Sequence, residues 1–548
     1  MCKFISFVTS KMLSIITYYY ERFCNIYILS AGLTVIFILL KPSLLLANPN
    51  IIIFYVDDMG WMDWSDGSDF YETPNMRALA DQGVKFMQAY SPAANSTPSR
   101  ACLLTGRTPA RLNVTDVVAN QTVFTKNYLE QSEITIAEVA KTKGYKTCLI
   151  GKWHLGAIAT YGPQFQGFDT VIGTCDNGMP GSYFWNYNGQ PYFYTGTPGE
   201  YLTDRLTSEA EQWIRANKND PFLLYLSHYG VHVPIQAKQS YIDYFAGKAD
   251  GLWHNNDTYA AMLKSIDDSL GKIMQLLVEE NIVDNTIIIF SSDNGGEQIT
   301  PNYGRITNNY PLREGKTYPY EGGIRIPLII KWPGVTSSAS IDNTMVGQVD
   351  LFPTICEMIN ADLPQGVALD GVSIAPLLSK SGSINRDALY WHFPHYRINE
   401  NKNITPYSII RKGDYKLIKN YEDNSLELYN INSDISESNN IAESEPGIRD
   451  SMHQELRDWL DSVGAQLPLP AENMLENADF GNGVANWDKA ANVIISPTTA
   501  EFHSAPGAAL VENRTVYWHH IRQDVTEEVR ASGPGWYKLS AWVKRIGS

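Results

Sequence analysis

The stretch "NIIIFYVDD" at residues 50–58 is the strongest indication of the fold in this 548-residue chain. Residues 50–56 form an almost unbroken apolar run of strand length, which is typical of a strand buried on both faces of a sheet. The run ends in two adjacent aspartates, Asp57 and Asp58. Because ligands of open α/β sheets bind at the carboxyl ends of the strands, these two carboxylates indicate where a functional site would lie.

Further strands and helices follow in alternation, which predicts an α/β fold with a mostly parallel central sheet flanked by helices. The expected strands after the first are 84–91, 146–150, 221–227 and 285–292, and the expected helices are 73–83, 134–144, 200–217 and 259–281. Polar groups fall at five strand ends, and that repetition is difficult to attribute to chance.

The chain divides into an N-terminal leader and four further segments. The α/β domain is expected at 49–385 and a smaller antiparallel α+β subdomain at 386–466, with a meander over 388–431 and a helix at 448–463. A Pro-bearing linker follows at 467–473. Residues 474–548 are rich in aromatics and glycine without a helical period, which indicates a partial β-sandwich.

Residues 1–47 have the features of a signal peptide. Three basic residues precede a fifteen-residue apolar run at 26–40, and Ala47 is a small residue near a plausible cleavage site. The run is shorter than the roughly 20 residues of a membrane span. We therefore expect an exported protein, periplasmic or secreted, without stable membrane insertion after cleavage. An uncleaved N-terminal anchor is the alternative.

The net charge of −16 argues against a nucleic-acid partner, since such proteins concentrate lysine and arginine. An acidic surface also repels anionic substrates at long range, so an anionic substrate would need local cations to capture it. None of the six cysteines shows C-x-x-C spacing, so neither a zinc site nor a redox motif is indicated.

Four oxygen-bearing side chains follow two of the expected strands: Asp57, Asp58, Asp293 and Asn294. Carboxylates and an amide carbonyl are ligands of Ca²⁺ or Mg²⁺, and adjacent aspartates repel unless a cation neutralises them. Aspartates that only cap helices or close turns are the alternative.

A second set is cationic or proton-sharing: Arg100, Lys152, His154, His232 and Lys316. Taken singly, each lysine could be a solvated surface group and each histidine a structural one. Gathered beside a divalent cation, they would bind a tetrahedral oxyanion and stabilise charge during its transfer.

The stretch "NSTPSRACLLTGR" at 95–107 supplies the candidate nucleophile, Ser96. Capping by Thr97 and a helix starting near Pro98 would explain part of it, and the helix would add its N–H groups to an anion site. No Ser–His–Asp arrangement is evident that would activate a plain hydroxyl.

Residues 96–107 match every defined position of the signature of the type I, formylglycine-dependent sulfatases of the alkaline phosphatase superfamily: Ser-x-Pro-Ser-Arg, three variable residues, then Leu-Thr-Gly-Arg. A second signature of that family resembles "GYKTCLIGKWHLG" at 144–156. The resemblance covers roughly residues 49–466 and implies an alkaline-phosphatase-like fold.

The resemblance implies that Ser96 is oxidised after translation to formylglycine, whose hydrate attacks sulfur with one hydroxyl and expels sulfate with the other. It implies that Ca²⁺, ahead of Mg²⁺, is held by Ser96 and the four oxygen-bearing side chains. Arg100 and His154 would hold the aldehyde hydrate, and Lys152, His232 and Lys316 would contact the sulfate. His232 or Lys316 would protonate the leaving oxygen, and His228 would contact the substrate.

A serine at this position implies maturation by a bacterial radical enzyme that uses S-adenosylmethionine. The C-terminal segment, with "NMLENADF" at 473–480, Trp487 and "YKLSAWV" at 537–543, resembles the start of a carbohydrate-binding module. Together these features predict an exported sulfatase that acts on a sulfated carbohydrate of algal type, as a poly- or oligosaccharide.

Two other functions stay open at this point: a phosphate or phosphonate ester hydrolase of the same superfamily, and a non-catalytic glycan-binding protein. Placement in expected loops suggests four residues for the rim of the pocket: Trp61, His254, His395 and Arg397.

Overall fold

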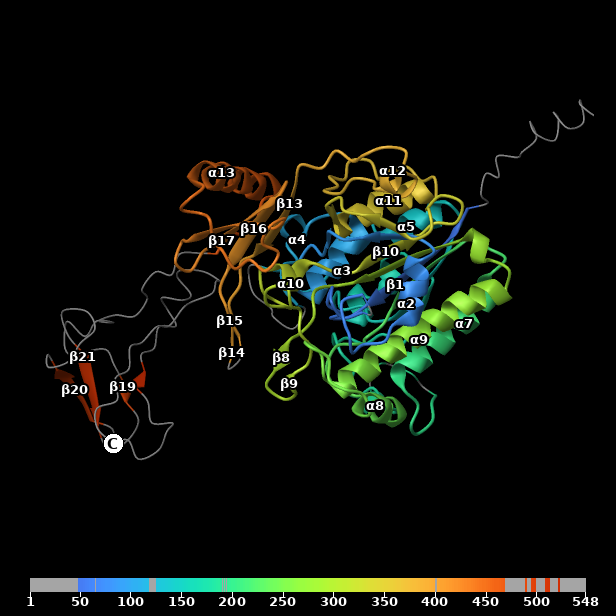
Figure 1. The fold of residues 1–548 in the computed structure, drawn as a ribbon, viewed down its shortest axis with the longest axis horizontal. Coiled ribbons are helices and arrows are strands. Elements are labelled where there is room, and N and C mark those ends of the chain that lie inside the picture. The colour runs from blue at the N-terminus through green and yellow to red at the C-terminus, as the bar shows by residue number, and fades with distance from the viewer. Residues whose placement is uncertain are drawn as a thin grey trace, which may run out of the picture.

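The computed structural model describes residues 48–468, except 65, 118–124, 190, 192, 194 and 400–401, together with four short strands nearer the C-terminus (Figure 1). An eight-stranded sheet forms its centre, in the order β11-β2-β10-β7-β1-β6-β4-β5. The predicted leader at 1–47 lies outside the described residues, as do residues 469–473 of the linker predicted at 467–473. The same applies to the residues that carry the likeness to a carbohydrate-binding module: 473–480, Trp487 and 537–543.

Strand β1 (Asn50–Val56) lies in the middle of this sheet, and all seven of its residues are buried. Ile52, Phe54 and Val56 pack into one hydrophobic core. Ile51, Ile53 and Tyr55 pack into a second core on the opposite face. The unbroken apolar run therefore reflects burial on both faces, as predicted.

Strand β1 pairs in parallel with β6 (Phe222–Ser227) and β7 (Thr286–Ser292). β4 (Lys146–Gly151) and β5 (Thr170–Ile172) extend the parallel part beyond β6. On the other side, β10 (Leu328–Lys331) is antiparallel to both β7 and β2. The α/β prediction with a mostly parallel sheet is confirmed, and the antiparallel strand makes the sheet mixed.

The expected strand at 84–91 is two strands. β2 (Val84–Phe86) joins the central sheet, whereas β3 (Ala89–Tyr90) pairs with β12 (Val346–Gly347) in a separate ladder. β3 leads directly into the segment that carries Ser96.

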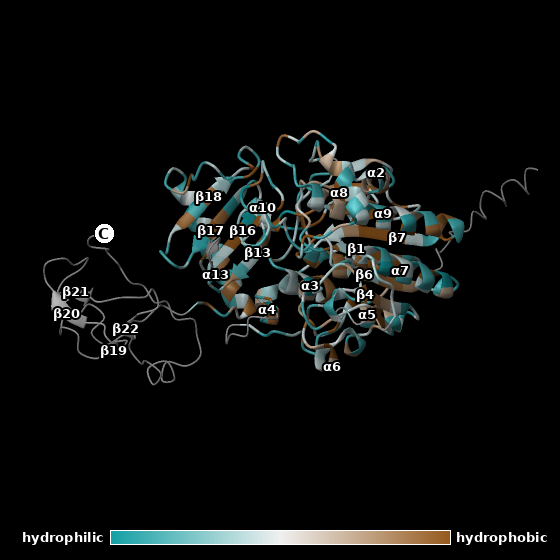
Figure 2. Ribbon diagram, turned by 90° about the horizontal axis from the view of Figure 1, so that it is seen from below, coloured by the Kyte–Doolittle hydropathy of each residue, from teal (hydrophilic) through white to brown (hydrophobic). Residues whose placement is uncertain are grey.

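Helices cover both faces of the sheet (Figures 1 and 2). Helices α2 (Pro74–Ala80), α7 (Leu202–Asn217), α8 (Gln239–Ala246) and α9 (Asp257–Glu279) contribute to the first core. Helices α3 (Ser96–Thr105), α5 (Ile136–Thr142), α11 (Leu351–Met358) and α12 (Ala375–Leu378) contribute to the second.

A four-stranded antiparallel sheet forms the smaller subdomain, in the order β13-β16-β17-β18. Its strands are β13 (Ala388–Phe393), β16 (Tyr407–Lys412), β17 (Tyr415–Asn420) and β18 (Leu426–Asn430). Helix α13 (Pro446–Val463) packs on one face through Met452, Leu456 and Leu460. The meander and the helix thus form where the sequence predicts them.

A buried ion cluster joins the two parts. Lys416 of β17 lies with its Nζ 2.8 Å from Glu437 Oε1 and 3.2 Å from Glu321 Oε1. Glu437 Oε2 accepts a hydrogen bond of 2.7 Å from the backbone N–H of Glu321, at the start of α10 (Glu321–Ile324). All three side chains are buried.

The remaining elements are short. They are α4 (Pro109–Leu112), α6 (Ile158–Tyr161), β8 (Ile299–Thr300), β9 (Gly304–Arg305), β11 (Ser340–Asp342), β14 (Arg397–Asn399), β15 (Lys402–Ile404), and four 3-10 turns at 163–165, 187–189, 283–285 and 348–350. Within the C-terminal segment, β19 (Asp488–Lys489) pairs with β22 (Ile521–Arg522) and β20 (Ile494–Thr498) with β21 (Ala508–Glu512), both antiparallel. No helix in the described part of the chain is both long and apolar enough to cross a bilayer.

Candidate active site

The parallel register of β1 and β7 brings together the four candidate metal ligands, Asp57, Asp58, Asp293 and Asn294. Val56 at the end of β1 pairs with Ser292 at the end of β7, so the residues that follow each strand emerge at one edge of the sheet. One oxygen from each of Asp57, Asp58 and Asp293 lies within 4.8 Å of the others. The backbone N–H of Asp58 donates to Asp293 Oδ1 at 3.0 Å, and Asn294 Nδ2 donates to Asp58 Oδ1 at 2.9 Å.

Ser96 lies beside this cluster as the first residue of α3. Its hydroxyl donates to Asp57 Oδ1 at 3.2 Å and lies 3.4 Å from Asn294 Oδ1. Lys152 Nζ donates to the same hydroxyl at 3.4 Å. The Ser96 hydroxyl therefore contacts the oxygens of two candidate metal ligands and the ammonium group of Lys152. Only 1% of the surface of Ser96 is exposed.

The capping expectation for Thr97 and Pro98 was wrong in detail. The helix begins at Ser96, and Asn95 is the N-cap residue without a side-chain capping bond. The Thr97 hydroxyl instead donates to the backbone oxygen of His154 at 3.0 Å, which ties the start of α3 to the loop after β4.

Arg100, one turn along α3, is fully buried and holds the carboxylates in place. Its Nε and Nη2 donate to Asp293 Oδ2 at 3.1 and 2.7 Å, and Nη1 donates to Ser227 Oγ at 2.6 Å. Nη2 also lies 3.6 Å from Asp57 Oδ1. A buried guanidinium with these partners stabilises the charge of two carboxylates that would otherwise repel each other.

Two lysines pair with the other carboxylate oxygens. Lys152 Nζ donates to Asp57 Oδ2 at 2.6 Å, and Lys316 Nζ donates to Asp58 Oδ2 at 2.7 Å. With Arg100, the three cations balance the three carboxylates.

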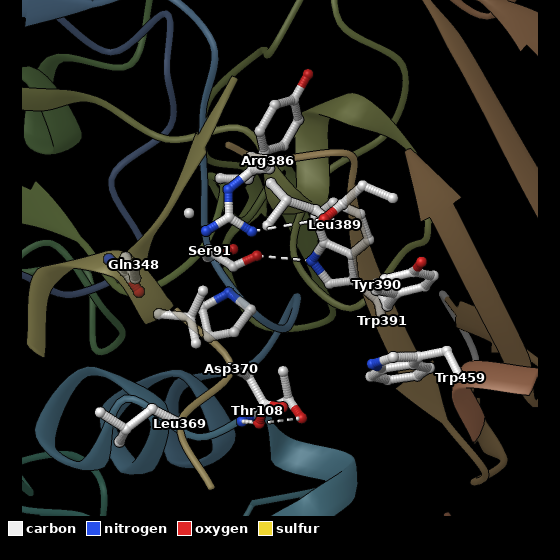
Figure 3. A pocket seen from close by; sticks show the side chains of 15 residues that line it. Ser91, Thr108, Gln348, Leu369, Asp370, Arg386, Leu389, Tyr390, Trp391 and Trp459 are labelled. Carbon is white, nitrogen blue, oxygen red and sulfur yellow. Dashed lines mark hydrogen bonds between the residues drawn. The ribbon is translucent and has the colours of Figure 1, made fainter. Parts of the chain in front are cut away.

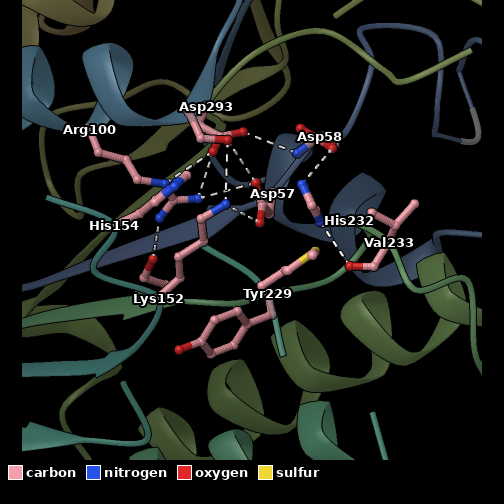
Figure 4. Close-up of polar contacts among 12 residues, drawn as sticks. Asp57, Asp58, Arg100, Lys152, His154, Tyr229, His232, Val233 and Asp293 are labelled. Carbon is pink, nitrogen blue, oxygen red and sulfur yellow. Dashed lines mark hydrogen bonds and ion pairs between the residues drawn. The ribbon is translucent and has the colours of Figure 1, made fainter. Parts of the chain in front are cut away.

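The two histidines line the same centre (Figure 4). His232 Nε2 lies 3.7 Å from Asp58 Oδ2, while its Nδ1 is bonded to the backbone oxygen of Val233 at 2.8 Å. His154 has a positive φ of 59°, and its buried Nδ1 has no hydrogen-bond partner among the described residues. Burial, followed by the nearby lysine charges, lowers the pKa of both imidazoles, that of His232 to about 3.

The carboxylates have perturbed proton affinities. Burial and the neighbouring Asp293 raise the pKa of Asp57 well above its ordinary value. Burial would also raise the pKa of Asp58, but Lys316 and His232 outweigh that effect and lower it. Buried, crowded carboxylates beside an amide oxygen are hard donors that suit Ca²⁺ or Mg²⁺, so these residues fit the implied ion.

Other predicted residues lie apart from this group. His228 is fully buried, with its Nε2 3.0 Å from Ser269 Oγ of α9 and its ring against Phe54, and no contact with the group above is found among the described residues. Three of the four rim candidates have internal partners: His254 bonds Asn308 and Ser68, His395 bonds Thr115, and Arg397 pairs with Asp116. Trp61 packs under the guanidinium of Arg325 at 4.7 Å.

The structure also adds residues that the sequence did not single out. Ser227 ends β6 and accepts from Arg100, a role that its place at a strand end could have suggested. Gly178 lies so close to the His154 ring that an added Cβ would come within 2.3 Å of its Nε2. Asn95 is buried next to Ser96 with neither side-chain polar atom bonded in the described structure. The sequence carries no signal for the last two.

Comparison with known proteins agrees with this geometry. Residues 49–361 match the family model described as Sulfatase, and residues 315–463 match that of the N-sulphoglucosamine sulphohydrolase C-terminal region. A sulfatase of Formosa agariphila is 33% identical over 514 residues, covering 78% of this chain and 91% of that protein. Human N-acetylgalactosamine-6-sulfatase is 32% identical over 366 residues, covering 63% and 68%.

Among solved structures, that of Ps i-CgsB in complex with k-i-k-neocarrahexaose is similar, with a TM-score of 0.64 and 29% identity over 75% of this chain and 93% of that one. A phosphonate monoester hydrolase of Agrobacterium radiobacter shares the fold alone, with a TM-score of 0.54 and 20% identity over 76% of this chain and 96% of that one. The family match over more than half of the chain shows that this protein belongs to the sulfatase family, whose members hydrolyse sulfate esters.

Proposed function

We propose that this sulfatase removes sulfate from a carbohydrate through a formylglycine formed at Ser96 and a bound Ca²⁺. The observation that carries the proposal is the position of Ser96 Oγ, within 3.5 Å of Asp57, Asn294 and Lys152. A group at this point touches both the oxygen-rich cluster and a sulfate-binding cation.

The charge balance supports a cation that arrives with an anionic substrate. Lys152 pairs with Asp57, and Lys316 pairs with Asp58. A divalent cation held by Asp57, Asp58, Asp293 and Asn294 would supply positive charge at the sulfate oxygens. The carboxylates would then be neutralised by the ion, and both ammonium groups would turn toward the sulfate.

The other residues have separate tasks in this proposal. Formylglycine supplies the nucleophile that a plain serine lacks. Arg100 keeps Asp293 ionised and fixed through its hydrogen bonds to that carboxylate. His154 belongs to the loop after β4, and the hydrogen bond from Thr97 to its backbone oxygen ties this loop to the start of α3. Lys316 or His232 donates a proton to the leaving oxygen.

A carbohydrate substrate is supported by the relatives. Ps i-CgsB is described in complex with k-i-k-neocarrahexaose. The human relative is named N-acetylgalactosamine-6-sulfatase, and one from Bacteroides thetaiotaomicron is named N-acetylgalactosamine-6-O-sulfatase. We propose a sulfated poly- or oligosaccharide of algal type as the substrate, and export to the periplasm or medium, for which the leader sequence is the support. The C-terminal segment is proposed as a carbohydrate-binding module on its sequence likeness, and maturation by a serine-type radical enzyme on the identity of residue 96.

The test combines mass spectrometry with sulfate release. The tryptic peptide that contains Ser96 should be two hydrogens lighter in an active preparation, and Ser96→Ala should fold, keep its thermal stability and release no sulfate from sulfated oligosaccharides. Active protein with an unmodified Ser96 would contradict the proposal that formylglycine is the nucleophile. Faster turnover of matched phosphate esters than of sulfate esters would overturn the choice of ester.

A further inference from the structure

A cavity of about 280 Å³ lies between the α/β domain and the smaller subdomain (Figure 3). Residues 90–92, 108, 347–349 and 369–370 line it from the α/β domain, and 386, 388–391 and 459 line it from the other side. Interfaces between domains are common positions for ligand sites, and this volume lies near the lower end of the range of about 300–1,000 Å³ that is typical of small-molecule pockets.

The cavity is separate from the active site. Ser96 begins α3, whereas Thr108, which lines the cavity, follows the end of that helix. Ten helical residues span about 15 Å. None of the residues assigned to the sulfate or the metal lines this cavity.

Its charged groups are paired into neutral units. Both carboxylate oxygens of Asp370 are satisfied internally: they accept from Arg111 Nη2 at 2.7 Å and Nε at 3.0 Å, and from the backbone N–H and the hydroxyl of Thr108 at 2.8 and 3.0 Å. Arg386 pairs with Asp350 on the other wall. Because each guanidinium has its own carboxylate, a sulfate or phosphate group would gain no net attraction here.

Two donors are nevertheless left for a ligand. The side chain of Arg386 is 93% buried, and its Nε has no hydrogen-bond partner within the described structure. Among the described residues, its Nη1 makes only a long contact of 3.5 Å to the backbone oxygen of Ala388. A buried donor without a partner is costly, which indicates that a polar group belongs beside it.

Aromatic side chains form the third wall. Trp459 of α13 stacks on Tyr390 of β13 with ring centroids 4.7 Å apart and planes 6° from parallel. Trp391 is fixed by a hydrogen bond of 2.7 Å from its Nε1 to the backbone oxygen of Ser91. In Figure 3 the nitrogen-bearing edge of Trp459 is turned toward the cavity. Rings with one apolar face and one polar edge suit a ligand with both C–H and O–H surfaces.

We propose that this cavity, lined by Arg386, Asp370 and Trp459, is a second, non-catalytic site that holds a neutral pyranose unit of a glycan. Sugar hydroxyls accept from the unpaired Nε–H of Arg386, and the C–H face lies against the aromatic wall. The choice of a sugar as the ligand rests on the proposed function, whereas the position of the site does not.

The experiment is saturation-transfer NMR and calorimetry with D-galactose, D-glucose and D-mannose as probes, on the full chain carrying Ser96→Ala. That protein lacks the catalytic group, so sugar binding and sulfate release succeed or fail independently. We expect one or more of the sugars to bind, and Trp459→Ala to weaken binding at least tenfold. Leu369→Trp, which fills the cavity without removing the stacked pair, should abolish it.

Trp253→Ala is the matched control, since Trp253 is 41% exposed and stacks on Tyr310 away from the cavity. It should leave sugar binding unchanged, and thermal denaturation of each variant verifies folding. Absence of binding for all three sugars would overturn the proposal. So would binding that survives Leu369→Trp or that is lost in Trp253→Ala.

Discussion

Lys152 donates a hydrogen bond of 2.6 Å to Asp57, and both side chains are fully buried. Such a pair is stable only while each charge has its partner, because removing one leaves the other unpaired in a poorly solvated site. In the proposed reaction Lys152 binds the sulfate and Asp57 binds the metal ion, so this ion pair competes with both ligands. Lys316 and Asp58, whose side chains are 11% and 3% exposed, form a second ion pair for which we expect the same competition.

This competition predicts opposite effects of Lys316→Met on two ligands. Calcium should bind more tightly, by roughly tenfold, because a charge a few ångströms from the ligands is worth about 1–4 kcal/mol. Inhibition by inorganic sulfate should weaken. Calorimetry on chelator-treated protein measures the first effect and inhibition of turnover the second.

Lys218→Met is the control for this pair of measurements, since Lys218 pairs with Glu280 on the surface. It should change neither value. Calcium affinity that falls in Lys316→Met would contradict the assignment of Asp58 as a ligand in competition with the lysine.

The proton donor to the leaving group can be identified with substrates of different leaving groups. We expect Lys316→Ala to lose at least a hundredfold more activity on an alkyl sulfate than on 4-nitrophenyl sulfate, because a nitrophenolate departs without help. His232→Ala should lose similar factors on both. The reverse pattern in kcat/KM would assign the proton to His232.

Gly178→Ala should damage the site without unfolding the protein. An added Cβ would lie 2.3 Å from both Cε1 and Nε2 of His154, so the imidazole has to move. We expect turnover to fall by about a hundredfold, because a displacement of a catalytic group by about 1 Å can cost that much. Gly447→Ala, where nothing lies within 4 Å, is the control. Full activity in Gly178→Ala would show that the ring position does not matter.

The ion cluster at the domain boundary predicts a pH-dependent stability. Burial, together with the Glu321 carboxylate, raises the pKa of Glu437 to about 7, although Lys416 opposes the shift. Between the ordinary glutamate pKa and about 7, the folded state binds more protons than the unfolded state. The free energy of unfolding should therefore fall as pH rises through this window, by at most about 1.4 kcal/mol per pH unit from this group.

Denaturant unfolding of Glu437→Gln across pH 5–8 tests this. The variant should show a flatter dependence than the parent protein, whereas Glu443→Gln, whose side chain is 98% exposed, should follow the parent. Identical slopes in the parent and Glu437→Gln would contradict the assignment.

The sequence predicted the sheet and the centre of the site because both depend on local pattern. A run such as residues 50–56 has to be buried on both faces, and parallel register then places Asp57 beside Asp293. The incorrect prediction of one strand at 84–91 concerns contacts between distant segments of the chain. The strand at 84–91 breaks because β3 pairs with β12, some 260 residues further along the chain.

Two of the four rim candidates are less exposed than expected, for a related reason. His254 and His395 are polar residues in loops, and sequence alone does not show whether such a loop faces solvent or the interior. Both prove to be buried, with partners in other segments. The close approach of Gly178 to His154 is likewise a property of the folded chain only.

Every residue of α3, from Ser96 to Thr105, is buried. A modifying enzyme could not bind this segment in the folded protein, since its active site would have to reach a Ser96 hydroxyl that is 1% exposed. The oxidation proposed for Ser96 must therefore be completed on the nascent or unfolded polypeptide. Under that proposal, a copy that folds before the oxidation would lack the catalytic aldehyde.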